Sequence, residues 1–238
     1  MVPARMGSSR FPGKPLFDIG GVPLVVRSAR RAIAAGCFQR VVVATEDQEI
    51  AQACLSHGLE SILTPTFPTG TDRVAWVAGE LGAAWVLNLQ GDEPVFPLEL
   101  LRDLCRLLPT EPDALWTAAD LSLSTEDRKD EDIVKIELHP PREGISRAGD
   151  FFRTLPDDSQ ERTWAIHVGV YGGSLAALQR FAHLPIPPEE TLRRIEPLRA
   201  LAHGMPVFAR IGTWPRAAVD RREHISVVLD LLTQEGAL

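Results

Sequence analysis

Residues 40–45 read RVVVAT, a short and almost wholly apolar run that is typical of a strand buried on both faces of a sheet. A helix pattern precedes this run at residues 23–35, and a second helix pattern follows it at residues 47–57. Asp47 opens the second pattern and is expected to cap that helix. A buried strand between two helices predicts an α/β arrangement.

The alternation of strand and helix continues to about residue 108. Further elements are expected at residues 60–63 (strand), 71–81 (helix), 84–89 (strand, AWVLNL) and 97–108 (helix). Apolar strands joined by helical crossovers predict a mainly parallel sheet with helices on both faces. Ligands bind such sheets beyond the C-terminal ends of the strands, so the loops that begin at Arg5, Glu46 and Gln90 are the candidates for a binding site.

The pattern changes from about Ile133, where strands become more frequent. The remaining elements are predicted at residues 133–138, 164–171 and 207–211 (strands) and at 174–181, 188–203 and 222–232 (helical segments). We expect one domain spanning residues 1–238, with a strand-rich excursion at about residues 133–172.

Composition excludes several classes of protein. The chain has 238 residues, 45% of them hydrophobic, which is enough for one large core. Its net charge of −7 argues against nucleic-acid binding. No apolar run approaches the length of a membrane span and no signal peptide is visible, so we expect no membrane partner and a cytoplasmic location. The three cysteines form no C-x-x-C pair and are predicted to be small buried side chains in a reducing compartment: Cys37, Cys54 and Cys105.

The segment PARMGSSRFPGKPL at residues 3–16 directly follows a short strand pattern. It carries Arg5, Arg10 and Lys14 together with two glycines. A triphosphate has about four negative charges and needs cations and close backbone N–H donors. The segment lacks the G-x-x-x-x-G-K-S/T spacing of a P-loop. It therefore predicts either a different phosphate-binding loop or a solvated loop with scattered charge.

A second loop, NLQGDEP at residues 88–94, ends the strand at 84–89. Asp92 lies there at the C-terminal edge of the predicted sheet, where a carboxylate suits Mg²⁺, which often takes only one or two carboxylates with phosphate and water. The alternative is an ordinary turn that opens the next helix. If both loops are functional, Asp92 and the cations of residues 3–16 should meet across one cleft.

The first loop resembles the signature P-A-R-x-x-S-S/T-R-L/F-P-G-K-P-L of the sugar-acid cytidylyltransferases, and the second resembles N-V/L-Q-G-D-E-P of the CMP-Kdo synthetases among them. The resemblance extends over nearly the whole chain. It implies a Rossmann-like nucleotidyltransferase fold and Mg²⁺-dependent coupling of CTP to the sugar acid Kdo in lipopolysaccharide precursor synthesis. It also implies a homodimer.

The resemblance implies roles for individual residues on the nucleotide side. Catalysis is assigned to Arg10, Lys14 and Asp92. Nucleotide contacts are assigned to Pro3, Ala4, Arg5, Ser9, Arg10, Lys14, Thr71 and Arg73. Metal binding is assigned to Asp92 and Asp220, although the glycine, threonine and proline of the family's G-V-D-T-P segment are missing around Asp220. Asp220 has the alternative role of capping the last helix.

The acceptor side is predicted from weaker matches. Substrate contacts are assigned to Gln90, Arg147, His167, Tyr171 and Glu190. His167 and Tyr171 lie four apart in a strand and should share one face. Arg147 belongs to an S-R-A segment without the family's P-W continuation, and Arg193 replaces a glutamate common in the family. Glu190 and Glu196 lie six apart and need not share a helix face, so one of them has the alternative role of a solvated helix charge.

Two other functions remain open from the sequence. One is the same chemistry on a different acceptor, such as a sialic-acid-like or amino-substituted octulosonate sugar, or with another nucleotide. The other is a non-catalytic nucleotide-binding module that has lost its metal site. A dinucleotide-dependent oxidoreductase is disfavoured, because no G-x-G-x-x-G follows the first strand.

Overall fold

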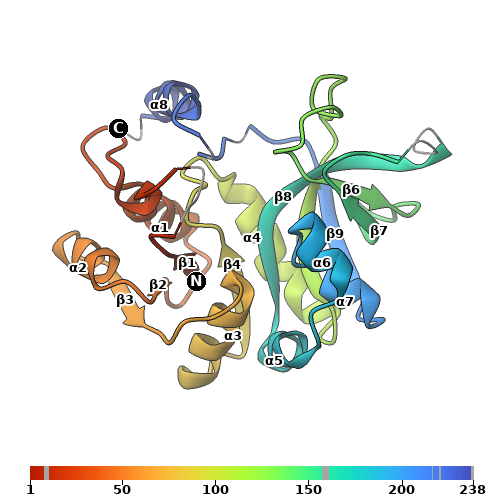
Figure 1. Ribbon diagram of the computed structural model, residues 1–238, viewed down its shortest axis with the longest axis horizontal. Coiled ribbons are helices and arrows are strands. Elements are labelled where there is room, and N and C mark those ends of the chain that lie inside the picture. Colours follow the sequence, from red (N-terminus) through yellow and green to blue (C-terminus); the bar gives the residue numbers. More distant parts are fainter. Residues whose placement is uncertain (8–10, 157–160, 216, 220, 237–238) are drawn as a thin grey trace. The chain divides into compact units, whose positions relative to one another are not determined.

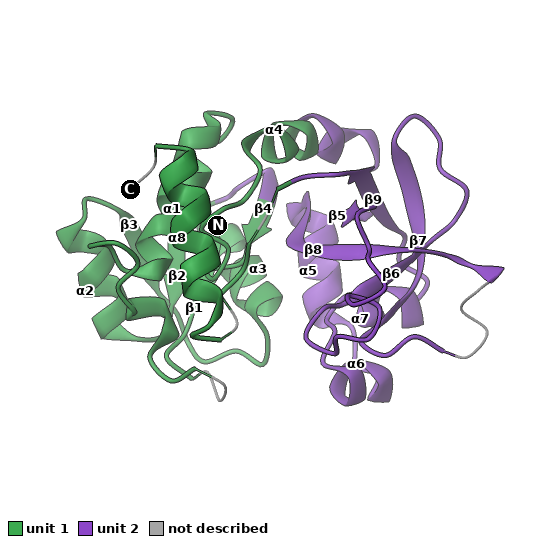
Figure 2. Ribbon diagram, turned by 90° about the horizontal axis from the view of Figure 1, so that it is seen from above, with its two compact units in different colours: residues 1–81, 87–105, 215–238 green, residues 82–86, 106–214 purple. Residues whose placement is uncertain are grey.

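The computed structural model describes residues 1–7, 11–156, 161–215, 217–219 and 221–236 (Figure 1). The chain divides into two compact units, coloured separately in Figure 2. Unit 1 comprises residues 1–81, 87–105 and 215–238, and unit 2 comprises residues 82–86 and 106–214.

Unit 1 is built on a three-stranded parallel sheet. Its strands are β1 (Val2–Ala4), β2 (Val42–Thr45) and β3 (Glu60–Leu63), in the order β1-β2-β3. Ala4, Thr45 and Leu63 align at the ends of the three strands. The loops that follow β1 and β2 therefore start at the same edge of the sheet, as the sequence pattern predicted.

Helices cover both faces of this sheet. The helical elements of unit 1 are the 3₁₀ helix η1 (Lys14–Leu16), α1 (Leu24–Ala35), α2 (Gln48–Ser56), α3 (Gly70–Glu80), α4 (Leu98–Leu107) and α8 (His224–Gln234). Val43 packs in a cluster with α1 and α2, whereas its neighbours Val42 and Ala44 pack with Val77 of α3. This alternation along one strand is the period-two pattern of a sheet with a core on each side.

The last helix returns to the beginning of the chain. Val228 and Leu232 of α8 lie in one buried cluster with Phe11 and Ile19, which flank η1. Through Phe11, α8 thus packs on the glycine-rich loop, the segment at residues 3–16.

Unit 2 contains a sheet with a different topology. Its strands are β4 (Trp85–Leu89), β5 (Leu115–Asp120), β6 (Lys135–Leu138), β7 (Ile145–Phe152), β8 (Thr163–Ser174) and β9 (Val207–Gly212). The order is β4-β8-β5-β9-β7-β6, and β6 also pairs with β8, so five strands close on themselves. The chain passes from unit 2 to unit 1 within β4. The helical elements are η2 (Leu108–Thr110), α5 (Leu175–His183), α6 (Pro188–Arg193) and α7 (Leu198–Ala202).

The α/β class is confirmed, but the prediction of a mainly parallel sheet holds only for unit 1. In unit 2, β8 runs antiparallel to β5 and β6, β7 runs antiparallel to β6 and β9, and β5 and β9 are parallel. The strand-rich part is also wider than residues 133–172, because β5 and β9 join the same sheet. No helix in the described part of the chain has both the length and the apolar character to cross a bilayer.

Two strands and one helix break were missed. All six residues of β5 are buried, so it has no alternation to reveal a strand, and β7 contains Gly149 and several polar residues. The helix predicted over residues 188–203 is divided in two. The break follows from Arg194, which has a left-handed φ of 56°, and from Pro197 at the start of α7.

Candidate functional site

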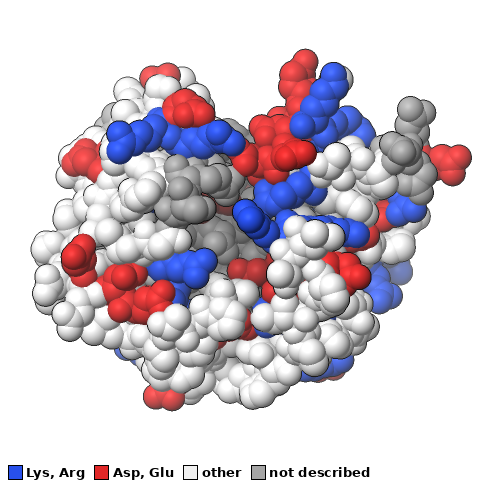
Figure 3. All heavy atoms as spheres, in the orientation of Figure 1, with Lys and Arg blue, Asp and Glu red and all other residues white. Residues whose placement is uncertain are grey.

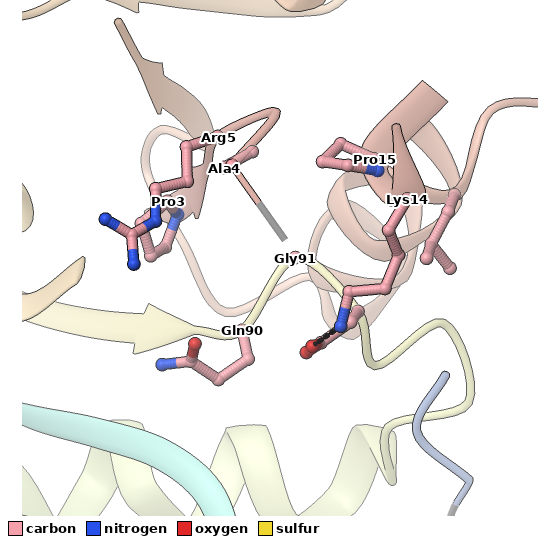
Figure 4. A pocket seen from close by; sticks show the side chains of 10 residues that line it. Pro3, Ala4, Arg5, Lys14, Pro15, Gln90 and Gly91 are labelled. Atoms are coloured by element: carbon pink, nitrogen blue, oxygen red, sulfur yellow. Dashed lines mark hydrogen bonds and ion pairs between the residues drawn. The ribbon is translucent and has the colours of Figure 1, made fainter. Parts of the chain in front are cut away.

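Loops that follow β1 and β4 meet in a pocket of unit 1 with a volume of about 250 Å³ (Figure 4). Arg5 and Lys14 approach this pocket from either side of Gly91. The pocket is lined by Pro3, Ala4, Arg5, Gly7, Lys14, Pro15, Leu24, Gln90, Gly91 and Asp92. Both sequence segments that predicted a nucleotide site thus contribute to one pocket.

The Lys14–Asp92 pair joins the two loops directly. Lys14 Nζ donates to Asp92 Oδ2 at 2.5 Å, although the two residues are 78 apart in sequence. The side chains are 14% and 28% exposed, so the pair is only partly withdrawn from solvent. This contact confirms the prediction that a cation of residues 3–16 and the Asp92 carboxylate meet across one cleft.

Gly91 allows the two loops to come together. A Cβ at this position would lie 2.9 Å from the Pro3 carbonyl oxygen and 3.7 Å from the Ala4 Cβ. Any larger residue would push the Gln90–Asp92 turn away from the end of β1. The Gly91 carbonyl oxygen also accepts a hydrogen bond from Ser28 Oγ of α1 at 2.9 Å, which fixes the turn from its other side.

The glycine-rich loop is anchored by a carboxylate to which sequence analysis gave another role. Asp47 makes no side-chain capping hydrogen bond to α2, contrary to our prediction. Its Oδ2 instead accepts a hydrogen bond from the backbone N–H of Met6 at 2.8 Å. Asp47 therefore bonds to the Met6 N–H of the loop and not to the N–H groups at the start of α2. Its position just after β2, at the edge of the sheet where the loop after β1 also begins, is the sequence signal for this role. Ser9 and Arg10, both predicted nucleotide contacts, lie outside the described residues.

Thr71 and Arg73 lie near the start of α3 but do not line the pocket. Thr71 Oγ1 accepts a hydrogen bond from Asn88 Nδ2 at 3.2 Å, and Thr71 is 2% exposed. Arg73, also 2% exposed, has Nη2 3.1 Å from Glu46 Oε1. Glu46 Oε2 and Asn88 Oδ1 are buried without a hydrogen-bond partner among the described residues. Glu46 begins one of the predicted binding loops and Asn88 begins the NLQGDEP motif, but neither side chain was predicted to have a role of its own.

The residues that could hold a metal ion are few. Among the described residues, no group of three or more His, Cys, Asp or Glu side chains is arranged to bind one. Asp220, the second predicted ligand, lies outside the described residues. Its neighbour Val219 donates its backbone N–H to the Asp92 carbonyl oxygen at 2.9 Å. In the described part of the pocket, Asp92 is therefore the carboxylate available to a cation.

Unit 2 holds a polar and aromatic group on β8. The rings of His167 and Tyr171 are stacked, with centroids 5.3 Å apart and an interplanar angle of 24°, which confirms that they share one strand face. The Phe151 ring meets His167 edge-on at 5.3 Å. His167 Nε2 lies 3.0 Å from Thr117 Oγ1 on β5, a partner that sequence analysis missed because β5 itself was missed.

Glu190 lies in a buried ion pair. Arg199 donates from Nε and Nη2 to the two carboxylate oxygens of Glu190 at 2.9 and 2.6 Å. The side chains are 5% and 1% exposed, and the Arg199 guanidinium also lies over the Phe181 ring at 4.5 Å. The alternative of a solvated helix charge is therefore wrong for Glu190. Its predicted contact with sugar hydroxyls stays a prediction.

Two arginines of unit 2, Arg147 and Arg193, differ in exposure and in hydrogen bonding. Arg147 is an exposed residue of β7. Arg193 donates from Nη1 to Asp150 Oδ1 and to the Phe151 carbonyl oxygen, each at 2.9 Å, and its guanidinium lies over the Phe152 ring. On the face drawn in Figure 3, basic and acidic side chains are interspersed, in line with the net charge of −7.

Comparisons with known proteins identify relatives of the whole chain. A family model described as "Cytidylyltransferase" matches residues 1–207. The 3-deoxy-manno-octulosonate cytidylyltransferase of Halorhodospira halophila is 40% identical over 242 residues, covering 96% of this chain and 94% of that protein. The solved structure of CMP:2-keto-3-deoxy-manno-octonic acid synthetase complexed with CTP has a TM-score of 0.81 and 30% identity, covering 98% of this chain and 97% of that one.

A more distant likeness bears on the fold alone. UDP-glucose pyrophosphorylase complexed with UDP-glucose has a TM-score of 0.67 at 14% identity, covering 98% of this chain and 97% of that one. Together with the nearer structure, it confirms the predicted Rossmann-like nucleotidyltransferase fold.

Proposed function

The chain belongs to the cytidylyltransferase family, and we propose that it couples CTP to the sugar acid Kdo, giving CMP-Kdo and pyrophosphate. The observation that carries this proposal is the Lys14–Asp92 contact in the pocket of unit 1. This contact brings a phosphate-binding cation and a carboxylate suited to a hard metal ion to one place. The resemblance of both loops to the family supports the choice of nucleotide and acceptor.

Lys14 and Arg5 are proposed to bind the phosphates of CTP. Lys14 supplies a point charge on a flexible stem, and Arg5 supplies a planar set of donors for phosphate oxygens. Because Lys14 is already held at the pocket by Asp92, little rearrangement is needed to place it on a phosphate. Pro3, Ala4 and Gly91 line the pocket with closely spaced backbone.

The residues present fit a magnesium ion. Asp92 offers a carboxylate that is 28% exposed at the pocket, and Mg²⁺ commonly takes only one or two carboxylates together with phosphate oxygens and water. Asp92 would hold the ion, with Asp220 as a second ligand implied by the resemblance. Bound Mg²⁺ supplies a Lewis acid that neutralises phosphate charge.

The acceptor is proposed to contact Gln90 and the residues His167, Tyr171, Arg147 and Glu190. The stacked His167 and Tyr171 rings offer polar edges on a rigid strand, which suits a polyhydroxy sugar. The His167–Thr117 contact supports a role in binding rather than proton transfer, because it engages Nε2 with a hydroxyl. The exposed guanidinium of Arg147 suits the carboxylate of a sugar acid.

In the proposed reaction, the anomeric hydroxyl oxygen of Kdo attacks the α-phosphorus of CTP in line. The bond from that phosphorus to the bridging oxygen breaks, pyrophosphate leaves, and the hydroxyl proton passes to solvent. Lys14, and Arg10 by resemblance, stabilise the charge that develops on the leaving pyrophosphate. Alignment of the two substrates by the residues named above supplies much of the remaining rate enhancement.

The proposal extends to the setting of the reaction. CMP-Kdo is an activated precursor sugar of lipopolysaccharide, and CTP is a nucleotide of the cytoplasm, so we propose a cytoplasmic enzyme of that synthesis. A homodimer is proposed from the family resemblance alone. Sedimentation of the purified chain at micromolar concentration measures the assembly directly, and a monomeric mass would remove this part of the proposal.

The function is tested by measuring pyrophosphate release from the full chain. Release is expected with CTP, Kdo and Mg²⁺ together, and a chelator should abolish it. Parallel reactions replace CTP with UTP, ATP or GTP, and Kdo with a sialic acid or an amino-substituted octulosonate. Faster release with one of these would reassign the substrate. Binding of CTP without release from any acceptor would instead identify a non-catalytic nucleotide-binding module.

A further inference from the structure

Two cysteines that are far apart in sequence lie against each other in unit 1. The Sγ atoms of Cys37 and Cys105 are 3.2 Å apart, although the residues are separated by 68 positions. This is closer than the ~3.5–4.0 Å at which non-bonded carbon atoms rest, even though sulfur is the larger atom. Both residues are half-buried, and neither is in a disulfide bond. Forming a bond would require the sulfurs to approach by about 1.2 Å, since a disulfide bond is about 2.0 Å long.

The local structure holds this pair in place. Cys37 follows the end of α1, where Gly36 adopts a left-handed φ of 67° and turns the chain. Cys105 lies in the last turn of α4. Arg102 of α4 donates from Nε to the Ala35 carbonyl oxygen at 2.9 Å and so ties the two helix ends together beside the thiols. The proximity of the thiols is therefore built into the packing of α1 on α4.

The third cysteine provides a contrast. Cys54 is fully buried on α2, and burial raises the pKa of its thiol to about 11. A thiol with so high a pKa holds almost no thiolate at neutral pH and reacts slowly with oxidants. Among the described residues, no third metal-binding side chain joins Cys37 and Cys105, so the pair is not part of a recognisable metal site. An oxidant should therefore act on this pair and leave Cys54 intact.

We propose that Cys37 and Cys105 form a reversible intramolecular disulfide when the protein meets a peroxide. One thiolate attacks the peroxide, an S–O bond forms, the O–O bond breaks and water leaves. The second thiol then attacks the resulting sulfenic sulfur, the S–S bond forms and a second water leaves. Two thiols are oxidised and one peroxide is reduced. A low-molecular-weight thiol reverses the reaction by exchange.

The crosslink stabilises unit 1 without blocking its pocket. It joins the C-terminal ends of α1 and α4, whereas the pocket is lined by Leu24 and Asp92, which lie at or before the N-terminal ends of those helices. A helix of ten residues is ~15 Å long, so the crosslink is separated from the pocket by about that length of helix. Closing a loop of 68 residues restricts the unfolded chain strongly.

The test treats the reduced full-length chain with a small excess of hydrogen peroxide. The intact mass should fall by two hydrogens, and peptide mapping should join Cys37 to Cys105 while Cys54 stays open to alkylation after unfolding. The midpoint of thermal unfolding should rise by about 5–10 °C and return after reduction with dithiothreitol. Pyrophosphate release by the oxidised chain should stay within about twofold of the reduced chain, given the separation of about three helical turns.

Three variants make the assignment specific. Cys37→Ser and Cys105→Ser should each lose both the mass change and the rise in the midpoint. Cys54→Ala is the matched control and should keep both, even if its starting midpoint is lower because a buried side chain is shortened. Should a variant fail to fold, thiol counting on the original chain still decides the question, since two of three thiols must disappear together.

Several results would overturn the proposal. One is an intermolecular disulfide on a non-reducing gel, and another is separate oxidation of single cysteines to sulfinic acid. A third is an unchanged protein mass at a peroxide concentration that is sufficient to oxidise free glutathione. These outcomes leave the proposed cytidylyltransferase reaction unaffected, because that reaction uses neither thiol.

Discussion

Two ion pairs, one in each unit, show how the same chemistry serves different purposes. Lys14 and Asp92 are 14% and 28% exposed and border a pocket. Glu190 and Arg199 are 5% and 1% exposed and form a two-point contact in the interior of unit 2. A half-open pair can exchange its partners for a ligand at little cost, whereas a sealed pair cannot lose one partner without leaving a buried charge. Exposure therefore separates a pair suited to binding from one suited to holding the fold.

The sealed pair gives the largest expected effect on stability. Arg199→Met keeps most of the side-chain volume over Phe181 but leaves the Glu190 carboxylate buried and unpaired. We expect a loss of ~3–5 kcal/mol in the free energy of unfolding, measured by urea denaturation. The double variant Glu190→Leu with Arg199→Met should recover most of that loss, because it buries no charge. A single variant as stable as the original chain would show that the pair does not support the fold.

The double variant also separates the two roles of Glu190. If Glu190 contacts the sugar as well as Arg199, the recovered protein should still show a raised KM for Kdo and an unchanged KM for CTP. If the KM for Kdo and the KM for CTP were the same in the double variant as in the original chain, Glu190 would not be a contact of the acceptor.

For the partly exposed Lys14–Asp92 pair, we expect a large effect on turnover and a small effect on stability. Lys14→Ala should lower kcat for pyrophosphate release by ~10²–10³-fold, the usual cost of removing one charge-stabilising donor. The free energy of unfolding should change little, because a partly exposed ion pair contributes ~0–1 kcal/mol. Lys129→Ala, which removes an exposed lysine of unit 2, is the matched control and should retain full activity. A Lys14 variant with normal turnover but low stability would reverse the comparison.

The close backbone packing of Gly91 against Pro3, next to Asp92, can be tested separately. Gly91→Ala would place a methyl group 2.9 Å from the Pro3 carbonyl oxygen. Overpacking of this kind costs ~1–3 kcal/mol, and the turn should move away from β1. We expect reduced CTP affinity in calorimetry together with this loss of stability. Gly82→Ala offers a control for backbone strain alone, since Gly82 has a φ of 59° and open space around it. Unaltered affinity in the Gly91 variant would show that the position of this turn does not affect CTP binding.

The smallest effect is expected on the acceptor side. Thr117→Val removes the hydroxyl that lies 3.0 Å from His167 Nε2 while keeping the shape of the side chain. Loss of one hydrogen bond costs ~0.5–1.5 kcal/mol, which should raise the KM for Kdo several-fold and leave the KM for CTP unchanged. A rise in the KM for CTP instead would place this contact on the nucleotide side.

Much of unit 1 could be predicted from the sequence because its signals are local. Apolar runs such as RVVVAT lie between helix patterns, and loops after parallel strands share an edge. Lys14 and Asp92 could therefore be expected to meet although they are 78 positions apart. Asp47 was misassigned because a carboxylate before a helix suits two roles, and only the position of Met6 distinguishes them. The choice between capping and anchoring depends on tertiary contacts.

Unit 2 was predicted less well because its contacts are distant in sequence. The uniformly buried β5 lacks periodicity, so Thr117 could not be paired with His167 in advance. Nor does spacing reveal the contact between Cys37 and Cys105, which depends on the packing of α1 on α4. Glu190 and Arg199 were both visible in a helical segment, but the break at Arg194 and the resulting two-point contact were not.

The central claim is that Asp92 serves the reaction and not the fold. The most direct measurement compares pyrophosphate release by Asp92→Asn and by the control Glu99→Gln, an exposed acid at the start of α4, over a range of Mg²⁺ concentrations. We expect Asp92→Asn to lose at least ~10³-fold in kcat at every Mg²⁺ concentration while its thermal unfolding midpoint is unchanged, and Glu99→Gln to match the original chain. Near-normal turnover by Asp92→Asn would contradict the account.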